Sequence, residues 1–116
     1  MSSITILHNP RCSKSRQTLA LLEEQGISPT VVEYLKTPLN RDDITSLFQK
    51  LGIESAHHMI RPKEAEFKEA GLSKASSNEE VFDALVSYPK LLERPVVING
   101  NKAKIGRPPE SVLDIL

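Results

Sequence analysis

The hydrophobic pattern at the start of the chain predicts a strand, a helix and a second strand in quick succession. Residues 4–7 are β-branched or aliphatic and run into a His-Asn-Pro breaker, as at the end of a short strand. Cys12 or Ser13 can then cap a helix that ends near Gly26, and residues 30–35 again read as a strand. Because the three elements arrive so closely, we expect a βαβ unit with parallel strands.

The middle of the chain carries a helical pattern. Asn40 is placed to cap a helix whose apolar residues recur at i, i+3, i+4 and i+7 until Gly52. A shorter helix is expected within residues 62–70, and Ser77 with Glu80 resembles a capping box ahead of another apolar run. The phenylalanines on these helices are interpreted as core residues without a chemical role.

The C-terminal pattern predicts a hairpin and a last helix. Residues 96–98 and 103–105 flank Asn99-Gly100, and Asn-Gly supplies the positive φ angles of a type I′ turn. A final helix is expected over about residues 109–115, with proline in its first turn. The predicted fold class is therefore α/β, a mixed sheet of thioredoxin-like outline with a helical insertion between the βαβ unit and the C-terminal hairpin and helix.

Length and charge add limits to this outline. A chain of 116 residues can bury one core, so we expect a single domain over residues 1–116. Lys+Arg and Asp+Glu both number 15, which supplies no overall field for nucleic acid or anionic lipid. No stretch approaches the roughly 20 apolar residues of a membrane span, and the first residues lack a secretion signal. We expect a cytoplasmic monomer without nucleic-acid or membrane partners.

Cys12 is the one cysteine, which excludes an internal disulfide and a thiolate metal cluster, so no bound metal is expected. It stands at or just before a predicted helix N-terminus, with Arg11, Lys14 and Arg16 close by. Backbone N–H groups and cations there lower the pKa of a thiol, which near its ordinary value of about 8.5 is only about 3% ionised at pH 7. Cys12 is therefore a candidate nucleophile, with a buried inert cysteine as the alternative.

Three familiar kinds of cysteine chemistry fit the sequence poorly. Ser15 occupies the position where a dithiol oxidoreductase has its second cysteine, so a disulfide would need a thiol from another molecule. A cysteine phosphatase loop needs a longer spacing than that from Cys12 to Arg16. A cysteine protease needs a base in contact with the thiol, and His57 and His58 lack an orienting motif.

Three arginines elsewhere each precede a proline: Arg61, Arg94 and Arg107. Surface arginines at the ends of helices and strands are the ordinary interpretation of such residues. Arg94-Pro95 differs, because a proline that opens this strand of a thioredoxin-like sheet is commonly cis and faces the active cysteine. A guanidinium can also bind a tetrahedral oxyanion through two parallel hydrogen bonds.

The motif His-Asn-Pro-x-Cys-x-x-Ser-Arg at residues 8–16, followed by Arg61, Arg94-Pro95 and Gly106-Arg107-Pro108, closely resembles the glutaredoxin-linked arsenate reductase family. The resemblance covers residues 4–116. It is greatest to the shorter, chromosomally encoded bacterial members, whereas longer, resistance-associated members continue past the last helix.

This resemblance implies reduction of arsenate to arsenite, an arsenic detoxification, with Cys12 as the nucleophile that becomes arsenylated. Glutathione would be the co-substrate and glutaredoxin would resolve the mixed disulfide, with no bound cofactor. Three arginines would form the oxyanion pocket, and three further residues would hold the thiolate. The pocket residues are Arg61, Arg94 and Arg107, and the thiolate-stabilising residues are His8, Ser15 and Arg16.

Other functions stay open at this point. The same site could serve a related thiol oxidoreductase whose substrate is another oxyanion or a protein disulfide. A non-enzymatic redox or transcription regulator that binds RNA polymerase can have the same fold. A redox-inert adaptor would have an ordinary pKa at Cys12.

Overall fold

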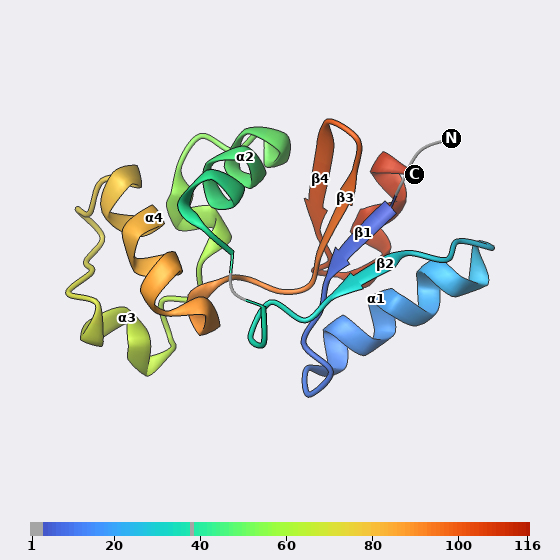
Figure 1. The fold of residues 1–116 in the computed structure, drawn as a ribbon, viewed down its shortest axis with the longest axis horizontal. Coiled ribbons are helices and arrows are strands. Elements are labelled where there is room, and N and C mark those ends of the chain that lie inside the picture. The colour runs from blue at the N-terminus through green and yellow to red at the C-terminus, as the bar shows by residue number, and fades with distance from the viewer. Residues whose placement is uncertain (1–3, 38) are drawn as a thin grey trace. The chain divides into compact units, whose positions relative to one another are not determined.

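In the computed structural model, which describes residues 4–37 and 39–116, a four-stranded sheet has the order β2-β1-β3-β4 (Figure 1). Its strands are β1 (Ile4–Leu7), β2 (Thr30–Val32), β3 (Val96–Asn99) and β4 (Lys102–Ile105). β1 pairs in parallel with β2 and antiparallel with β3, and β3 pairs antiparallel with β4. The mixed sheet and the parallel βαβ unit are thus confirmed.

The second strand is shorter than the predicted range of residues 30–35. Its last residue, Val32, accepts a hydrogen bond at its carbonyl from the His8 N–H at 2.8 Å. The chain then turns, because the N–H groups of Lys36 and Thr37 both donate to the Glu33 carbonyl. The apolar character of this segment therefore belongs partly to a turn in which Tyr34 is buried and Leu35 is exposed, rather than to a longer strand.

One long helix and one short helix complete the core around the sheet. α1 (Ser13–Glu24) buries Thr18 and Leu22 completely and is followed by Gly26 with a φ of 76°. η3 (Pro109–Ile115) has the predicted bounds, although it is a 3-10 helix. The apolar core in this region joins α1, η3, β1 and β3 through four fully buried side chains: Ile6, Leu22, Val97 and Val112.

The β3–β4 hairpin is confirmed, but the predicted type I′ turn is wrong. Asn99 pairs with Lys102 across the ladder, so the two turn residues are Gly100 and Asn101. Gly100 has a φ of 61°, and no non-glycine residue of the described chain has a positive φ. A type I′ turn needs positive φ at both central residues, whereas glycine in the first central position alone fits a type II′ turn. The pairing register places the turn one residue later than predicted, and this shift decides between a type I′ and a type II′ turn.

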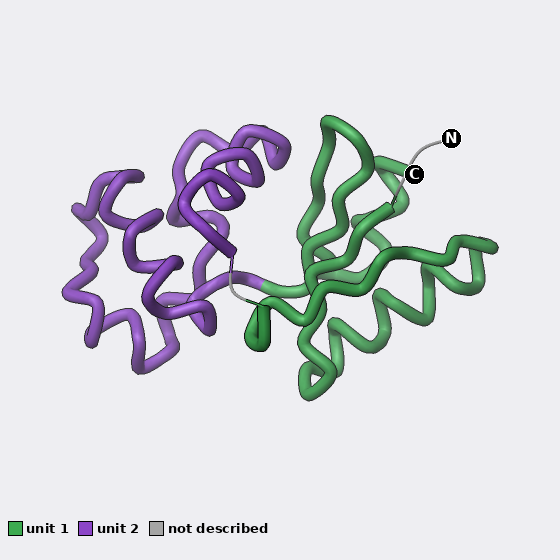
Figure 2. The backbone as a smooth tube through the Cα atoms, in the orientation of Figure 1, with its two compact units in different colours: residues 1–37, 94–116 green, residues 38–93 purple. Residues whose placement is uncertain are grey.

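The chain divides into two compact units, residues 1–37 with 94–116 and residues 38–93 (Figure 2). The sheet belongs to the first, which we call unit 1. Unit 2 is the predicted helical insertion. Its elements are α2 (Arg41–Leu51), η1 (Ala56–Met59), α3 (Ala65–Glu69), α4 (Asn78–Ser87) and η2 (Pro89–Leu91). That the whole chain is a single domain stays a prediction.

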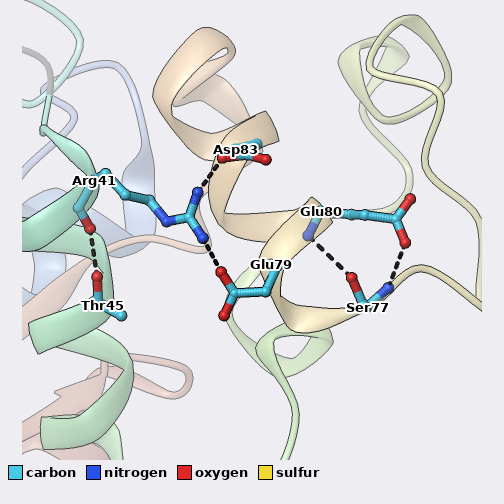
Figure 3. Close-up of polar contacts among 6 residues, drawn as sticks. All are labelled: Arg41, Thr45, Ser77, Glu79, Glu80 and Asp83. Carbon is cyan, nitrogen blue, oxygen red and sulfur yellow. Dashed lines mark hydrogen bonds and ion pairs between the residues drawn. The ribbon is translucent and has the colours of Figure 1, made fainter.

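Two capping boxes set the starts of the long helices in unit 2, where the sequence predicted the box at Ser77 and a cap at Asn40. The Asn40 side chain accepts a hydrogen bond from the Asp43 N–H at 2.8 Å, and α2 ends at Gly52. The Ser77 hydroxyl accepts from the Glu80 N–H while the Glu80 carboxylate accepts from the Ser77 N–H (Figure 3). Each box satisfies backbone N–H groups that the first turn of a helix leaves without partners.

Arg41 joins α2 to α4 within unit 2. Its guanidinium pairs with Glu79 and Asp83, both on α4, and its own carbonyl accepts a hydrogen bond from the Thr45 hydroxyl (Figure 3). The guanidinium carbon also lies 5.3 Å from the centre of the Phe82 ring. Aromatic packing and charge therefore hold the same two helices together. No helix within residues 4–37 and 39–116 has the length and apolar character that crossing a membrane requires.

Candidate active site

The turn between β1 and α1 is built around Asn9, a buried residue that the sequence identified only as part of a strand breaker. The Asn9 carbonyl accepts a hydrogen bond from the Cys12 N–H, and its side-chain oxygen accepts from the Arg11 N–H, both at 3.0 Å. Cys12 follows as the N-cap residue of α1 with an extended φ of −92°. Asn9 therefore folds the backbone so that the thiol stands at the helix N-terminus.

Ser15 anchors the first turn of α1 to the end of β1. Its fully buried hydroxyl lies 2.6 Å from Nδ1 of His8 and accepts a hydrogen bond from the Asn9 N–H at 3.0 Å. Because the Asn9 N–H occupies an acceptor position, the hydroxyl proton is free to be donated to a neutral His8 ring. The predicted partners His8 and Ser15 are thus brought together next to Cys12.

His8 is held as a neutral imidazole by its surroundings. Burial lowers its pKa, the Glu33 carboxylate partly opposes this, and the charge of Arg16 lowers it further. Together these effects place the pKa of His8 below its ordinary value, so the uncharged ring predominates at neutral pH. A neutral ring can accept the Ser15 hydroxyl proton, which the charged ring cannot do.

The Cys12 thiol has a lowered pKa, as the sequence predicts. Burial on its own raises the pKa of Cys12, but hydrogen bonds from the Ser15 N–H, the Arg94 side chain and the Lys14 N–H outweigh it. The positive charge of Arg94 acts in the same direction. The thiolate is therefore favoured by the helix N-terminus, as expected, and by a cation from the far end of the sequence rather than from the neighbouring residues.

Two arginines of unit 1 converge on the thiol. Nη2 of Arg107 lies 3.7 Å from Sγ of Cys12, and the Arg94 side chain also donates to that sulfur. Nε of Arg107 donates to the Arg94 carbonyl at 2.9 Å, so the two residues hold each other. Both precede a cis proline, in Arg94-Pro95 and Arg107-Pro108.

Gly106 allows the segment that carries Arg107 to lie close to α1. A Cβ at Gly106 would stand 2.7 Å from the Thr18 hydroxyl oxygen and 2.9 Å from the Pro95 ring. The Gly106 N–H donates to the Pro95 carbonyl at 2.9 Å. This close approach packs the Gly106 backbone against α1 and connects the two Arg-Pro segments.

Arg16 and Arg61 have other partners. Nη1 of Arg16 donates to the Pro10 carbonyl at 2.8 Å, which braces the Cys12 turn from its exposed side. Arg61 belongs to unit 2, where it pairs with Glu64 at 3.4 Å and Glu93 at 3.7 Å. Stabilisation of the thiolate by Arg16 and a place for Arg61 in the anion pocket both stay predictions.

The arrangement in unit 1 can support nucleophilic attack on an anion. A thiolate supplies the electron pair, and two guanidinium groups next to it supply positive charge for an oxyanion that the thiolate would otherwise repel. Because Cys12 is the one cysteine, any disulfide that it forms joins it to another molecule. Within the described residues, no three His, Cys, Asp or Glu side chains are grouped so that they could hold a metal ion.

Fold and site together define a thioredoxin-like protein with one activated cysteine beside a pair of arginines. The model of the ArsC family matches residues 7–115, and the chain belongs to this family. The sequence-based resemblance and the thioredoxin-like fold class are confirmed by this match and by the solved structures that share the fold.

Several relatives match over nearly the whole chain. The arsenate reductase of Haemophilus influenzae is 49% identical over 115 residues, which are 98% of this chain and 99% of that protein. An arsenate reductase of Escherichia coli is 40% identical over 117 residues and is longer, since the match covers 82% of it. The solved structure of an arsenate reductase from Vibrio cholerae superposes with a TM-score of 0.95 at 47% identity, covering 99% of this chain and 98% of that one.

Proposed function

We propose that this protein is an arsenate reductase that uses glutathione and glutaredoxin, with Cys12 as its nucleophile. The observation that carries the proposal is the contact of the Cys12 sulfur with both Arg94 and Arg107, 3.7 Å away in the case of Arg107. The names of relatives that match the full chain support arsenate as the oxyanion. The protein would act in the cytoplasm as a monomer.

In the first step, the Cys12 thiolate attacks arsenic(V) and forms an S–As bond, and one arsenate oxygen leaves as water after protonation. In the second, a glutathione thiolate attacks the Cys12 sulfur. The electron pair of the S–As bond then passes to arsenic, which leaves as arsenic(III) in arsenite. Two thiols have been oxidised to one mixed disulfide, which balances the two electrons gained by arsenic. A glutaredoxin thiol then attacks the glutathione sulfur and returns Cys12 to its reduced form.

The anion pocket of the proposal consists of Arg94 and Arg107, with Arg61 as a third member. Guanidinium groups stay charged at every physiological pH, so they can neutralise arsenate throughout the reaction. The charge that develops on the arsenate oxygens during attack is stabilised by donors already in place at the thiol. His8, Ser15 and Arg16 hold the turn in which the thiolate is generated.

Glutathione fits the site because the chain has no second thiol of its own. Ser15 stands at the third position after Cys12, and its hydroxyl is committed to His8 and Asn9. A protein so built must take its second reducing equivalent from another molecule, and glutathione is the abundant thiol of the cytoplasm. No bound cofactor is required.

The test is arsenite formation by the purified protein with arsenate, glutathione and glutaredoxin. Wild-type protein should produce arsenite, and Cys12→Ser should abolish it. Arg107→Ala should reduce kcat/KM for arsenate about tenfold or more, since it removes a charged donor at the reacting sulfur. The matched control is Arg11→Ala, an exposed arginine of the same turn.

Equal turnover by wild type and Cys12→Ser would contradict the proposal. Reduction of a protein disulfide or of another oxyanion, with no arsenite formed, would instead assign the same thiol to a different substrate.

A further inference from the structure

Gly106 differs from the other glycines of the chain in what it supplies. The other four have a positive φ, and a Cβ added to any of them would meet no neighbouring atom within 4 Å: Gly26, Gly52, Gly71 and Gly100. The φ of Gly106 lies outside the left-handed region, so its backbone conformation does not require glycine. A Cβ at Gly106 would instead collide with two side chains. Gly106 therefore supplies space rather than conformational freedom.

The two side chains that a Cβ at Gly106 would meet are held firmly. Thr18 is fully buried in α1, and its hydroxyl donates to the Lys14 carbonyl at 2.9 Å. Pro95 is also fully buried, and its ring has little conformational freedom. The Cβ would stand 2.7 Å from the Thr18 hydroxyl oxygen and 2.9 Å from the Pro95 ring, whereas ordinary van der Waals contact begins near 3.4 Å. Because neither neighbour moves freely, the segment that carries Gly106 would have to move away from α1.

The position of the Arg107 guanidinium depends on this segment. The Gly106 N–H donates to the Pro95 carbonyl at 2.9 Å, and Nε of Arg107 donates to the Arg94 carbonyl at 2.9 Å. These two bonds fix the backbone and the side chain against the same neighbouring segment. Nη2 of Arg107 then reaches the Cys12 sulfur at 3.7 Å. This contact is long for a hydrogen bond, so a small displacement of the segment would break it.

We propose that Gly106 is a positioning residue, whose lack of a side chain lets its segment approach Thr18 closely enough for Arg107 to meet the Cys12 sulfur. Gly106 has no side chain that could contact the sulfur, and it acts through Arg107. The proposal deepens the proposed function, since Arg107 is there assigned to the arsenate pocket. The positive charge that it places at the thiol does not depend on which anion is the substrate.

The experiment compares two reagents that alkylate Cys12 in the full-length protein, iodoacetate and iodoacetamide. Both react with the same thiolate, so the ratio of their rates cancels the ionised fraction of the thiol. Iodoacetate is an anion and iodoacetamide is neutral, so the ratio measures the positive charge that an anion meets at the sulfur. Arg107→Ala should lower the ratio, and Gly106→Ala should lower it about threefold or more at low ionic strength although Arg107 is present.

Gly100→Ala is the matched control. Gly100 lies in the turn at the other end of β4, where alanine would have to adopt a φ of 61° but would meet no neighbouring atom. This variant should lose stability and keep the wild-type ratio, which separates a loss of stability from a loss of position. An equal fall of the ratio in Gly100→Ala and Gly106→Ala would overturn the proposal.

The double variant Gly106→Ala with Arg107→Ala decides whether Gly106 acts through Arg107. Its ratio should match that of Arg107→Ala alone, because the displaced segment then carries no guanidinium to withdraw. A further fall in the double variant would overturn the proposal. A wild-type ratio in Gly106→Ala or in Arg107→Ala would overturn it as well.

Thr18→Ala tests the steric contact itself. It removes the hydroxyl and the methyl group that lie 2.7 and 3.2 Å from the Cβ position of Gly106. In the Thr18→Ala background, Gly106→Ala should lower the ratio less than it does in the wild-type background, because only the contact with the Pro95 ring remains. Equal losses in the two backgrounds would overturn the proposal.

Thermal unfolding establishes first that each variant is folded. If Gly106→Ala alone does not fold, the roomier Thr18→Ala background provides the test. There the addition of Gly106→Ala should still lower the ratio, and an unchanged ratio would overturn the proposal. Arsenate turnover is measured separately, so a wild-type protein without turnover would count against the proposed function, while the alkylation ratios would still decide the role of Gly106.

Discussion

Ser15 serves the candidate site through two separate groups. Its backbone N–H donates to the Cys12 sulfur, and its hydroxyl binds His8 and the Asn9 N–H. The first contact favours the thiolate directly. The second keeps the first turn of α1 against the end of β1, so that the N–H groups of this turn continue to face the sulfur. One buried serine therefore connects the stability of the turn to the reactivity of the thiol.

Ser15→Ala should affect both properties. The buried Asn9 N–H would lose its acceptor, which costs about 1–3 kcal/mol in the free energy of unfolding. The midpoint of Cys12 alkylation should move to higher pH, because the first turn of α1 loses its anchor. Chemical denaturation and iodoacetamide kinetics measure the two effects. Ser13→Ala, at an exposed position of the same turn, is the control. A Ser15→Ala protein with the wild-type free energy of unfolding would show that the hydroxyl does not stabilise the fold.

The sequence indicates which residues belong to the site better than it indicates which partners those residues contact. Cys12 stood out because it precedes a helix, and the Arg-Pro pairs stood out as repeated dipeptides. Local spacing alone does not show which basic residues contact the thiol, because Arg94 reaches it through the pairing of β1 with β3 and Arg107 follows β4. Asn9 was missed because a buried polar residue carries no periodic signal. The Asn-Pro dipeptide was the one visible indication of a turn at Asn9.

Among the elements, α4 shows how a few local residues fix the start of a helix. Ser77 and Glu80 exchange hydrogen bonds, with the two N–H donors reaching side-chain oxygens at 3.2 and 3.0 Å (Figure 3). The pKa of Glu80 is lowered by these hydrogen bonds from Ser77, which indicates that the box favours the ionised carboxylate. Such boxes depend on neighbours in the sequence, so they could be predicted without knowledge of the tertiary structure.

Ser77→Ala should lower the free energy of unfolding by about 1 kcal/mol, within the usual range of about 0.5–2 kcal/mol for an N-cap serine. The loss arises because the Glu80 N–H exchanges its fixed acceptor for water. Urea denaturation followed by circular dichroism measures it. Ser87→Ala, at the exposed last residue of α4, should change stability by less than about 0.5 kcal/mol. Equal losses in the two variants would count against the capping box.

Strand ends and turns were less predictable than helix caps. The register of β3 against β4 places Gly100 at the first turn position, and a one-residue difference exchanged one turn type for another. The end of β2 is likewise set by a hydrogen bond to His8 rather than by a change in residue type. Both features depend on a partner strand, and a partner strand is not visible in a local pattern.

At the scale of the whole molecule, the sequence predicted the order of elements and the helical insertion correctly. It gave no sign that residues 38–93 form a compact unit with ion pairs of their own. Arg61 illustrates the difficulty. An arginine before a proline suits an anion pocket, yet the same side chain pairs with Glu64 and Glu93 inside unit 2. An arginine can pair with a carboxylate as well as with an oxyanion, and the sequence alone does not show which of the two partners it takes.

The stability of the protein should fall on mild acidification. The pKa of His8 is lowered in the folded state, so between this value and the ordinary value near about 6.5 the unfolded chain binds the extra proton. Stability is then complete above about pH 6.5 and is lost as the pH falls toward the folded pKa. The same sign holds for Cys12 below its ordinary value of about 8.5, since its pKa is also lowered.

Urea denaturation at a series of pH values measures this dependence. His8→Gln should flatten the slope below about pH 6.5, because it removes one of the groups that titrate there. His58→Gln, at an exposed histidine of unit 2, is the comparison and should retain the slope. A wild-type protein whose stability rises on acidification through this range would have the opposite linkage and would contradict the neutral state assigned to His8.

The half-buried Cys12, placed at the very start of α1 as the sole cysteine of a chain without tryptophan, makes the protein suited to optical measurement. A thiol-reactive fluorophore would attach at one defined position without prior removal of other cysteines. With no indole emission to overlap it, the dye would report directly on the surroundings of Arg94 and Arg107. Labelled protein would lose its nucleophile but keep both guanidinium groups, so the arrival of an anion could be observed separately from any reaction that follows.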